Sequence, residues 1–385
     1  MHNDVVKVND YFVRHDVNIG LFFYRTNTGL VYAIANHALN RNLENLSKAQ
    51  FVNNIAVIIN SYMPTDIQLL PDPKDWPGGP QEKLRKPLVV NWLITNNCTH
   101  RCYYCYANDV IDNDRFACSE KTYKEIAYNI IKQNPLAVVL SGGEPLLCQG
   151  IEKIIGCLMG KAGIIIDTNG YRTDEMQALV PLLKENKIHV RVSLDTLRIK
   201  EISKTRPSRV KINDEKNLSQ TMSTVNLLLQ NDIDLTIQTV LTKRNANDLL
   251  AMGDKLWRMG VKTWRIFELQ ESFKPNENTD LLVFSDIRDK KIRRNSYFYE
   301  ILQDKCLKYW HGMVIKQTPA EGDRNNVVLV LPDGKFYTQA KNNAGKVLLN
   351  GKNPYMASSY TYAELSWGAH FERYIQSSVS KEIKE

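Results

Sequence analysis

The chain contains no stretch of apolar residues long enough to cross a membrane, although 43% of its 385 residues are hydrophobic. A helix that spans a bilayer needs about 20 consecutive apolar residues, so we expect no membrane partner. The first residues also lack the basic and then apolar order of a secretory signal peptide. Together these absences predict a soluble, cytoplasmic protein of ordinary globular composition.

Cysteine is scarce and unevenly placed. The chain has seven cysteines, and three of them fall within the eight residues 98–105. In a chain that we expect to be cytoplasmic, such a cluster favours metal ligation over disulfides. We predict that the scattered cysteines are small buried apolar side chains. These are Cys118, Cys148, Cys157 and Cys306.

Acidic residues are fewer than basic ones, which gives the chain a formal net charge of +8. Basic residues are densest at 198–211 and 288–294. Such runs are typical of a solvated surface, but they also fit attraction to an acidic peptide, a nucleotide or a nucleic acid. Because no segment resembles a nucleic-acid-binding module, we expect no specific nucleic-acid partner.

Residues 1–70 are predicted to form a small α+β domain of winged-helix-like shape. Three short strands are expected, at residues 11–15, 20–25 and 29–34. An amphipathic helix is expected to begin near Ser47, where apolar residues recur at three-to-four spacing. Residues 71–86 are predicted to be a linker, because segment 71–80 contains four prolines and two glycines.

Residues 87–272 alternate between strand and helix patterns and form the predicted core domain. The strand segments are 88–95, 136–140, 163–167, 188–194, 234–241 and 262–269. Parallel strands need crossover connections, so this alternation predicts a parallel sheet in an α/β architecture. Six units are too few to close an eight-stranded TIM barrel. We therefore expect a partial (β/α)6 barrel, with its site at the C-terminal ends of the strands.

Residues 273–385 are predicted to be a C-terminal extension, because the alternation stops after Gln270. Its clearest feature is a hairpin, in which strands at 327–331 and 335–338 flank an Asp333-Gly334 turn. Cys306 is the only cysteine in this extension. One cysteine cannot hold an iron–sulfur cube, so we expect no auxiliary cluster there.

The three clustered cysteines follow the first core strand with the spacing CxxxCxxC. Thiolates at Cys98, Cys102 and Cys105 can hold three corners of a [4Fe–4S] cluster and leave the fourth iron open for another ligand. A zinc site with His100 as a fourth ligand is an alternative, although zinc ligands more often come as two separated pairs. The same spacing could also arise by chance in a loop.

This segment resembles the signature CxxxCxΦC of the radical S-adenosylmethionine (SAM) superfamily, with Tyr104 at the aromatic position. The resemblance extends over about residues 87–270 and points to the subgroup of peptide-modifying enzymes and the molybdopterin cyclase. It implies one [4Fe–4S] cluster and SAM as cofactors. It also implies reductive cleavage of SAM to a 5′-deoxyadenosyl radical, with electrons from a donor such as flavodoxin or ferredoxin.

Further segments resemble family motifs in the family's order. Gly142, Gly143 and Glu144 resemble the GGEP motif, whose backbone and carboxylate contact the SAM amino group. Thr168 and Asn169 resemble a TNG segment at the end of the third strand.

The later strands continue the resemblance. Ser193 stands where a serine meets the SAM ribose or carboxylate, and Asp195 where an aspartate lies beside the substrate. Arg206 stands where an arginine pairs with the SAM carboxylate, with Arg198 and Arg209 as nearby alternatives. Val240 and Phe267 fall on strands that meet adenine.

The two ends of the chain bear on the substrate. Many peptide-modifying relatives carry a cysteine-rich SPASM extension, and this chain lacks its cysteines. The N-terminal domain resembles a RiPP recognition element, which binds a leader peptide by strand addition, here at the last or middle strand. The first hypothesis is therefore modification of a ribosomally made precursor peptide. The alternatives are a nucleotide or other small molecule as substrate, and a non-catalytic scaffold.

Overall fold

The structure is a computed structural model. It describes residues 4–36, 39, 42–62, 84–105, 107, 111, 120–268, 294–318, 327–338, 340–341, 347–348 and 367–375. The predicted linker segment 71–80, the basic residues 288–293 and Cys118 lie outside the described residues. No helix in the described ranges is both long and apolar enough to cross a membrane.

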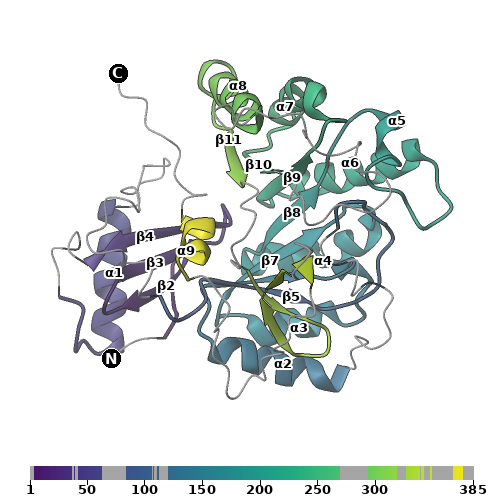
Figure 1. Cartoon of the computed structure of the whole chain (residues 1–385). Helices are drawn as coiled ribbons and strands as arrows, with labels where there is room; N and C mark the ends of the chain where they lie inside the picture. The colour runs from purple at the N-terminus through teal and green to yellow at the C-terminus, as the bar shows by residue number, and fades with distance from the viewer. Residues whose placement is uncertain are drawn as a thin grey trace.

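A nine-stranded sheet forms the centre of the core domain, with the order β11-β10-β9-β8-β7-β6-β5-β12-β13. The six predicted core strands are β5 (Val89–Leu93), β6 (Ala137–Ser141), β7 (Gly163–Thr168), β8 (His189–Ser193), β9 (Leu235–Leu241) and β10 (Thr263–Glu268). All six are parallel, which confirms the predicted partial barrel (Figure 1).

The C-terminal extension widens this sheet at both edges, which the sequence did not predict. Helix α8 (Arg294–Lys308) leads to β11 (Val314–Thr318), which pairs parallel to β10. Strand β12 (Val328–Val330) pairs parallel to β5, and the expected hairpin joins it to β13 (Phe336–Thr338). The alternation of helix and strand thus continues beyond Gln270. Two short strands, β14 (Ala340–Lys341) and β15 (Val347–Leu348), pair with each other.

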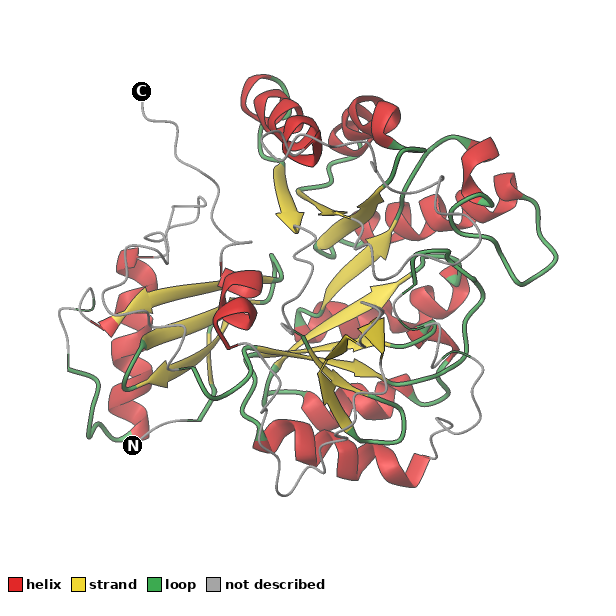
Figure 2. Cartoon of the chain, in the orientation of Figure 1, coloured by secondary structure: helices red, strands yellow, loops and turns green. Residues whose placement is uncertain are grey.

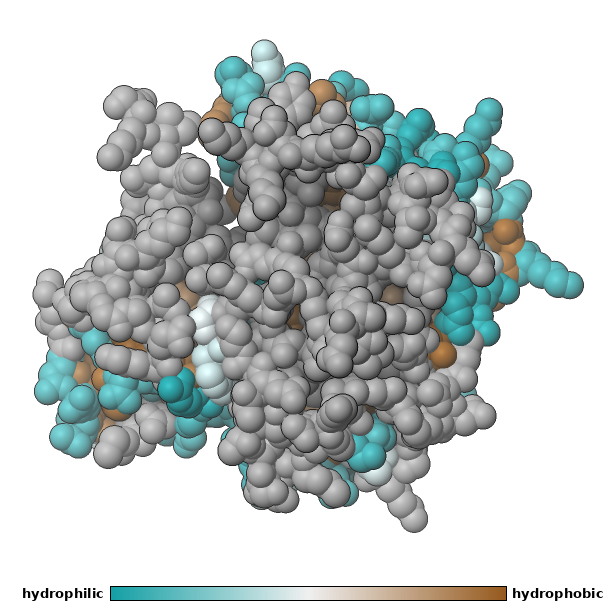
Figure 3. Space-filling view, viewed as in Figure 1, coloured by the Kyte–Doolittle hydropathy of each residue, from teal (hydrophilic) through white to brown (hydrophobic). Residues whose placement is uncertain are grey.

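Helices cover the outer face of the sheet (Figure 2). They are α2 (Glu120–Lys132), α3 (Ile151–Leu158), α4 (Thr173–Asn186), α5 (Ile199–Ile202), α6 (Asp214–Gln230) and α7 (Leu249–Arg258), with short 3₁₀ turns η5 (Pro145–Leu147) and η6 (Ala246–Asp248). Alternate strand residues such as Val90, Trp92 and Leu140 pack against them in the main hydrophobic core. In Figure 3 the described residues visible along the upper right rim are mostly hydrophilic.

The N-terminal domain is an antiparallel sheet with one long helix. Its strands, in spatial order, are β1 (Val6–Val8), β2 (Tyr11–Asp16), β3 (Gly20–Arg25) and β4 (Leu30–Ala35). Three of these strands were predicted, and β1 was not. Helix α1 (Lys48–Tyr62) begins at a capping box, in which Ser47 and Gln50 exchange side-chain to backbone hydrogen bonds. It packs on one face of the sheet through Phe51 and Ile55.

The other face of this small sheet covers the inner face of the barrel, at the N-terminal ends of its strands. Phe22 and Tyr24 pack there with Val89 and Ile165. A Cβ atom at Gly163 would lie 2.1 Å from the Tyr24 ring, so this contact requires glycine. Helix α9 (Trp367–Ile375) packs beside them, and its Phe371 ring meets Phe22 edge-on. The barrel interior is therefore closed at this end, which we call the floor.

Candidate active site

A cavity of about 280 Å³ lies inside the partial barrel, toward the C-terminal ends of its strands. Thirteen of the fourteen predicted site residues line it, and only Glu144 lies behind its wall. They are Cys98, Cys102, Tyr104, Cys105, Gly142, Gly143, Thr168, Asn169, Ser193, Asp195, Arg206, Val240 and Phe267. The structure thus brings together, in one space, residues that are spread over 170 positions of the sequence.

The cysteine loop, residues 98–105, follows β5 and is fastened by a second segment that the sequence did not reveal. The backbone N–H of Arg101 donates to the carbonyl of Pro207 at 2.9 Å, and Tyr103 N–H donates to Thr205 at 3.0 Å. These bonds connect the cysteine loop to the segment that carries Arg206. The thiols are therefore held by backbone pairing, and not only by packing.

Burial governs the chemistry of the three thiols. It raises the pKa of Cys98 to about 12, and it raises the pKa of Cys102 and of Cys105 as well. Such thiols ionise only when strong positive charge lies against them, as a bound metal supplies. Within the described residues, no group of three or more His, Cys, Asp or Glu side chains could hold one metal ion. Three thiols that each bind a different iron of a cluster need not converge on one point.

His100 does not offer a ligand to a metal. Its Nδ1 atom is 2.9 Å from Thr99 Oγ1, and its Nε2 atom is 3.1 Å from Asn217 Oδ1. Burial and the nearby Arg206 lower its pKa to about 3, so the ring is neutral. Both ring nitrogens are used inside the protein, which disfavours the zinc alternative and gives His100 a role in holding the loop.

The two glycines after β6 bring the cysteine loop close. A Cβ atom at Gly143 would lie 2.0 Å from the carbonyl oxygen of Asn97, so a side chain there would displace the loop. The N–H of Gly143 donates to Thr95 at 2.9 Å, and the N–H of Glu144 donates to Asn97 at 2.7 Å. The close approach expected from this motif is therefore made to the protein's own cysteine loop.

Glu144 is fully buried behind the cavity wall, and its carboxylate is saturated by the protein. It accepts hydrogen bonds from Thr168 Oγ1 at 2.8 Å, from Asn169 N at 2.8 Å and from Leu146 N at 3.2 Å. Burial raises its pKa to about 7, and these bonds oppose that rise. In this structure Glu144 positions the end of β7, and Asn169 in turn donates from Nδ2 to Thr99 Oγ1 in the cysteine loop at 3.0 Å.

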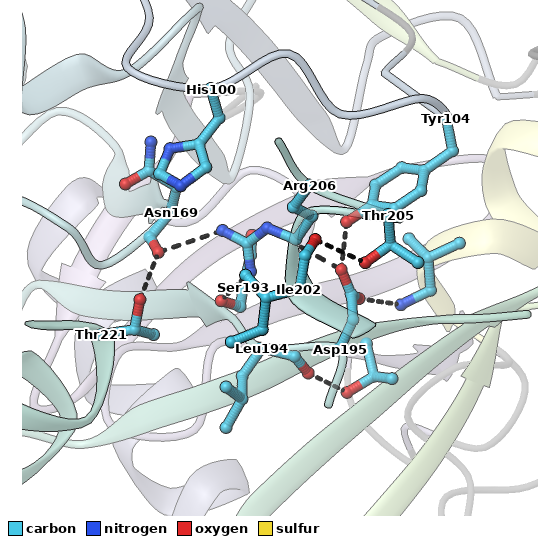
Figure 4. Close-up of polar contacts among 12 residues, drawn as sticks. His100, Tyr104, Asn169, Ser193, Leu194, Asp195, Ile202, Thr205, Arg206 and Thr221 are labelled. Carbon is cyan, nitrogen blue, oxygen red and sulfur yellow. Dashed lines mark hydrogen bonds and ion pairs between the residues drawn. The ribbon is translucent and has the colours of Figure 1, made fainter. Parts of the chain in front are cut away.

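Asp195 lies at the centre of a buried polar cluster beside the cysteines (Figure 4). Its carboxylate accepts hydrogen bonds from Tyr104 Oη and, at 2.8 Å, from the N–H of Val240. Burial raises its pKa, while Arg206, Tyr104 and the Val240 N–H oppose the rise. Tyr104, the aromatic residue of the cysteine motif, is thereby tied to the residue expected beside the substrate.

Arg206 connects the ends of two neighbouring strands, β7 and β8 (Figure 4). It donates to the carbonyls of Ser193 at 2.5 Å and Asn169 at 3.1 Å, and its Nε lies 3.8 Å from Asp195 Oδ2. Arg198, an alternative from the sequence, pairs instead with Asp248 and is half exposed. Of the three arginines considered from the sequence, Arg206 is the one that lines the cavity.

The sequence of residues 92–256 matches the Radical SAM superfamily. These residues form a radical SAM domain. The chain is 31% identical over 206 residues to an uncharacterized protein of Methanocaldococcus jannaschii. The aligned region makes up 51% of this chain and 66% of that protein. It is 29% identical over 128 residues to a GTP 3′,8-cyclase of Pseudomonas savastanoi, and that alignment makes up 31% of this chain and 38% of the cyclase. The matched region is thus less than two thirds of each of these relatives.

Solved structures share the fold. SuiB of Streptococcus suis bound to S-adenosylmethionine has a TM-score of 0.60, at 13% identity, over 86% of this chain and 82% of SuiB. SuiB bound to precursor peptide SuiA has a TM-score of 0.58, at 16% identity, over 90% of this chain and 88% of that one. At these identities the likeness shows the fold alone.

Radical SAM domains use a [4Fe–4S] cluster and SAM, and the residues of this cavity fit that pair. Three soft thiol donors lie on one wall, and polar groups from Thr168, Asn169 and Ser193 lie around them. The neutral His100 beside them adds no competing ligand.

A second set of polar residues, which was not predicted from the sequence, lines the same cavity, mostly nearer the floor. Its members are Asn91, Asp167, Arg191, Gln238, Arg265 and Thr318 from the strands, and Arg373 and Tyr374 from α9. Arg191, Gln238 and Arg265 stand two positions before Ser193, Val240 and Phe267. That spacing places each pair on the same face of its strand, so the period of two could have found them.

Proposed function

We propose that this protein is a radical SAM enzyme that abstracts a hydrogen atom from a ribosomally made precursor peptide. In this proposal Cys98, Cys102 and Cys105 hold one [4Fe–4S] cluster. The supporting observation is the gathering of the cysteine loop and the ends of five strands around one cavity. When bound, the cluster and SAM would supply a 5′-deoxyadenosyl radical.

The protein's own residues would bind and orient these groups. The backbone at Gly142 and Gly143 and the side chain of Asn169 face the cavity where SAM would lie. Arg206 and Asp195 fix the strand ends that shape its wall. The N-terminal sheet, packed across the floor, would keep water from a radical.

A peptide is the substrate that the N-terminal domain favours. Strand β3 pairs with both β2 and β4, so the middle of the sheet has no free edge. In the described residues the edge strands of this sheet are β1 and β4, so of the two positions expected from the sequence only the last strand, β4, could accept a leader peptide by strand addition. The fold likeness to SuiB in complex with its precursor peptide supports this choice.

A nucleotide is the second candidate. The similarity to GTP 3′,8-cyclase and the arginines that line the cavity favour it. Both candidates need the same radical, so the substrate alone separates them.

The test begins with anaerobic reconstitution. We expect about four irons per chain and cleavage of SAM to 5′-deoxyadenosine with a flavodoxin or a chemical reductant. A short peptide encoded beside the gene is then compared with nucleoside triphosphates, and mass spectrometry follows the loss of hydrogen. Modified nucleotide and unchanged peptide would overturn the peptide assignment, and absence of SAM cleavage would overturn the proposed activity.

A further inference from the structure

The cavity has a basic layer between the cysteines and the floor. Residues two positions apart on a strand are about 7 Å apart along it and point to the same face. Arg191 and Arg265 therefore lie one such step below Ser193 and Phe267, toward the N-terminal sheet. Arg373 reaches the same layer from α9. We call these three arginines, together with Lys316 beside Arg265 on β11, the basic layer, although Lys316 itself does not line the cavity.

One of these cations is neutralised inside the protein. Arg191 donates two hydrogen bonds to the Asp167 carboxylate, one from Nε to Oδ1 and one from Nη2 to Oδ2 at 2.8 Å. This bidentate geometry is the strongest form of the arginine–carboxylate pair. Asp167 is thereby committed to Arg191.

Arg265 has bonding capacity left over. Its side chain is only 8% exposed, and its guanidinium lies 4.7 Å from the Phe267 ring centre. Its Nε donates to Thr318 Oγ1 at 2.8 Å, but its Nη2 has no hydrogen-bond partner in the described chain. The Nε of Arg373 is buried and likewise unpartnered there. Buried donors of this kind are costly unless a ligand satisfies them.

The surrounding positive charges also favour an anion beside these unpartnered donors. Lys316 stands opposite Arg265 in the strand register and is also buried. Burial, together with Arg265 and Arg191, lowers the pKa of Lys316 well below its usual value. Burial, Arg373 and Arg191 likewise lower the pKa of Arg265 to about 9. The neighbouring cations thus disfavour the charge of Arg265 and of Lys316.

We propose that the basic layer binds one carboxylate of the substrate, from an acidic side chain or the C-terminus of the peptide. This inference rests on the proposed function, because it names the part of that peptide which enters the cavity. The open Nη2 of Arg265 and Nε of Arg373 are suited to a planar carboxylate. A polyphosphate fits less well, because it brings more acceptor oxygens than these two open donors can satisfy, whereas a carboxylate brings two.

The test measures anion binding to the reconstituted full-length protein with SAM present. The probes are glutarate, its neutral diamide glutaramide, and inorganic pyrophosphate, each titrated by calorimetry. We expect glutarate to bind and glutaramide not to bind. Arg265→Gln should weaken glutarate at least tenfold, because it removes a charge-assisted hydrogen bond. Arg258→Gln, the same change on an exposed helix end, should leave affinity unaltered.

Equal affinity of the wild type and Arg265→Gln for glutarate would overturn the inference, as would equal binding of glutaramide. Tighter binding of pyrophosphate than of glutarate would overturn it in favour of a nucleotide. Arg373→Gln, at a half-buried position on α9, repeats the test if the first variant does not fold. SAM cleavage by the wild type is measured in parallel. Its absence would contradict the proposed function, whereas cleavage without loss of affinity in the variants would contradict only this inference.

Discussion

The upper and lower halves of the cavity treat buried charge in opposite ways. Around the cysteines, Glu144 accepts three hydrogen bonds, and Arg206 is bound by two carbonyls and lies near Asp195. Nearer the floor, Arg265 and Arg373 keep buried nitrogens without partners among the described residues. A network whose polar groups are all hydrogen-bonded holds one geometry, whereas buried groups without partners favour the binding of a ligand that pairs with them. The upper half is thus built to hold a fixed arrangement, and the lower half to receive an anion.

The largest expected effect is in the upper half. Cys102→Ala should reduce iron from about four per chain to near zero, because two thiols cannot retain a cube that three hold. Cys157→Ala, at a half-buried position on α3, is the matched control and should keep full iron. Iron and sulfide analysis after anaerobic reconstitution checks both. A full iron content in Cys102→Ala would contradict the proposal that the cysteine loop holds the cluster.

The two halves also differ in how far the sequence could predict them. The six core strands are buried and apolar on the helix side, so their patterns stood out. The upper residues sit in short motifs at strand ends. Three other features depend on segments far apart in the chain, namely the added strands β11 and β12, the floor contact between Tyr24 and Gly163, and the place of α9. Local pattern carries little information on such contacts.

The next largest effect tests whether the upper charges are truly coupled. Asp195→Asn should lower the free energy of unfolding by on the order of 3 kcal/mol, because it leaves Arg206 as a buried cation without its carboxylate partner. The control is Asp234→Asn, whose pair with Lys262 has the same 3.8 Å separation but is exposed. That change should cost no more than about 1 kcal/mol. Chemical denaturation of both variants checks the difference, and equal costs would show that the upper cluster is not coupled.

Glu144→Gln should lower the affinity for SAM more than it lowers the iron content. The amide cannot accept all three hydrogen bonds with the strength of a carboxylate, so the Thr168–Asn169 segment should shift. Because these bonds lie within the protein, their weakening reaches SAM only through this shift, and we expect SAM affinity to fall by no more than about tenfold. Iron content should stay near the wild-type value. Glu152→Gln, on the exposed side of α3, is the control. Loss of iron with unchanged SAM affinity would contradict this role.

The smallest effect should have the opposite sign, and it is specific to the lower half. Arg265→Gln removes a buried cation that other cations disfavour, so without ligand the variant should be slightly more stable, by about 1 kcal/mol or roughly 2–4 °C in melting temperature. Arg258→Gln should not shift the melting temperature.

Glutarate should then reverse the order of the two melting temperatures. A ligand stabilises only the folded form that binds it, so saturating glutarate should raise the wild type above Arg265→Gln. Differential scanning calorimetry with and without glutarate measures both shifts. If Arg265→Gln is clearly less stable than the wild type in the absence of ligand, the guanidinium is already compensated within the protein. The contrast between a saturated upper half and an open lower half would then be wrong, because both halves would pair their charges internally.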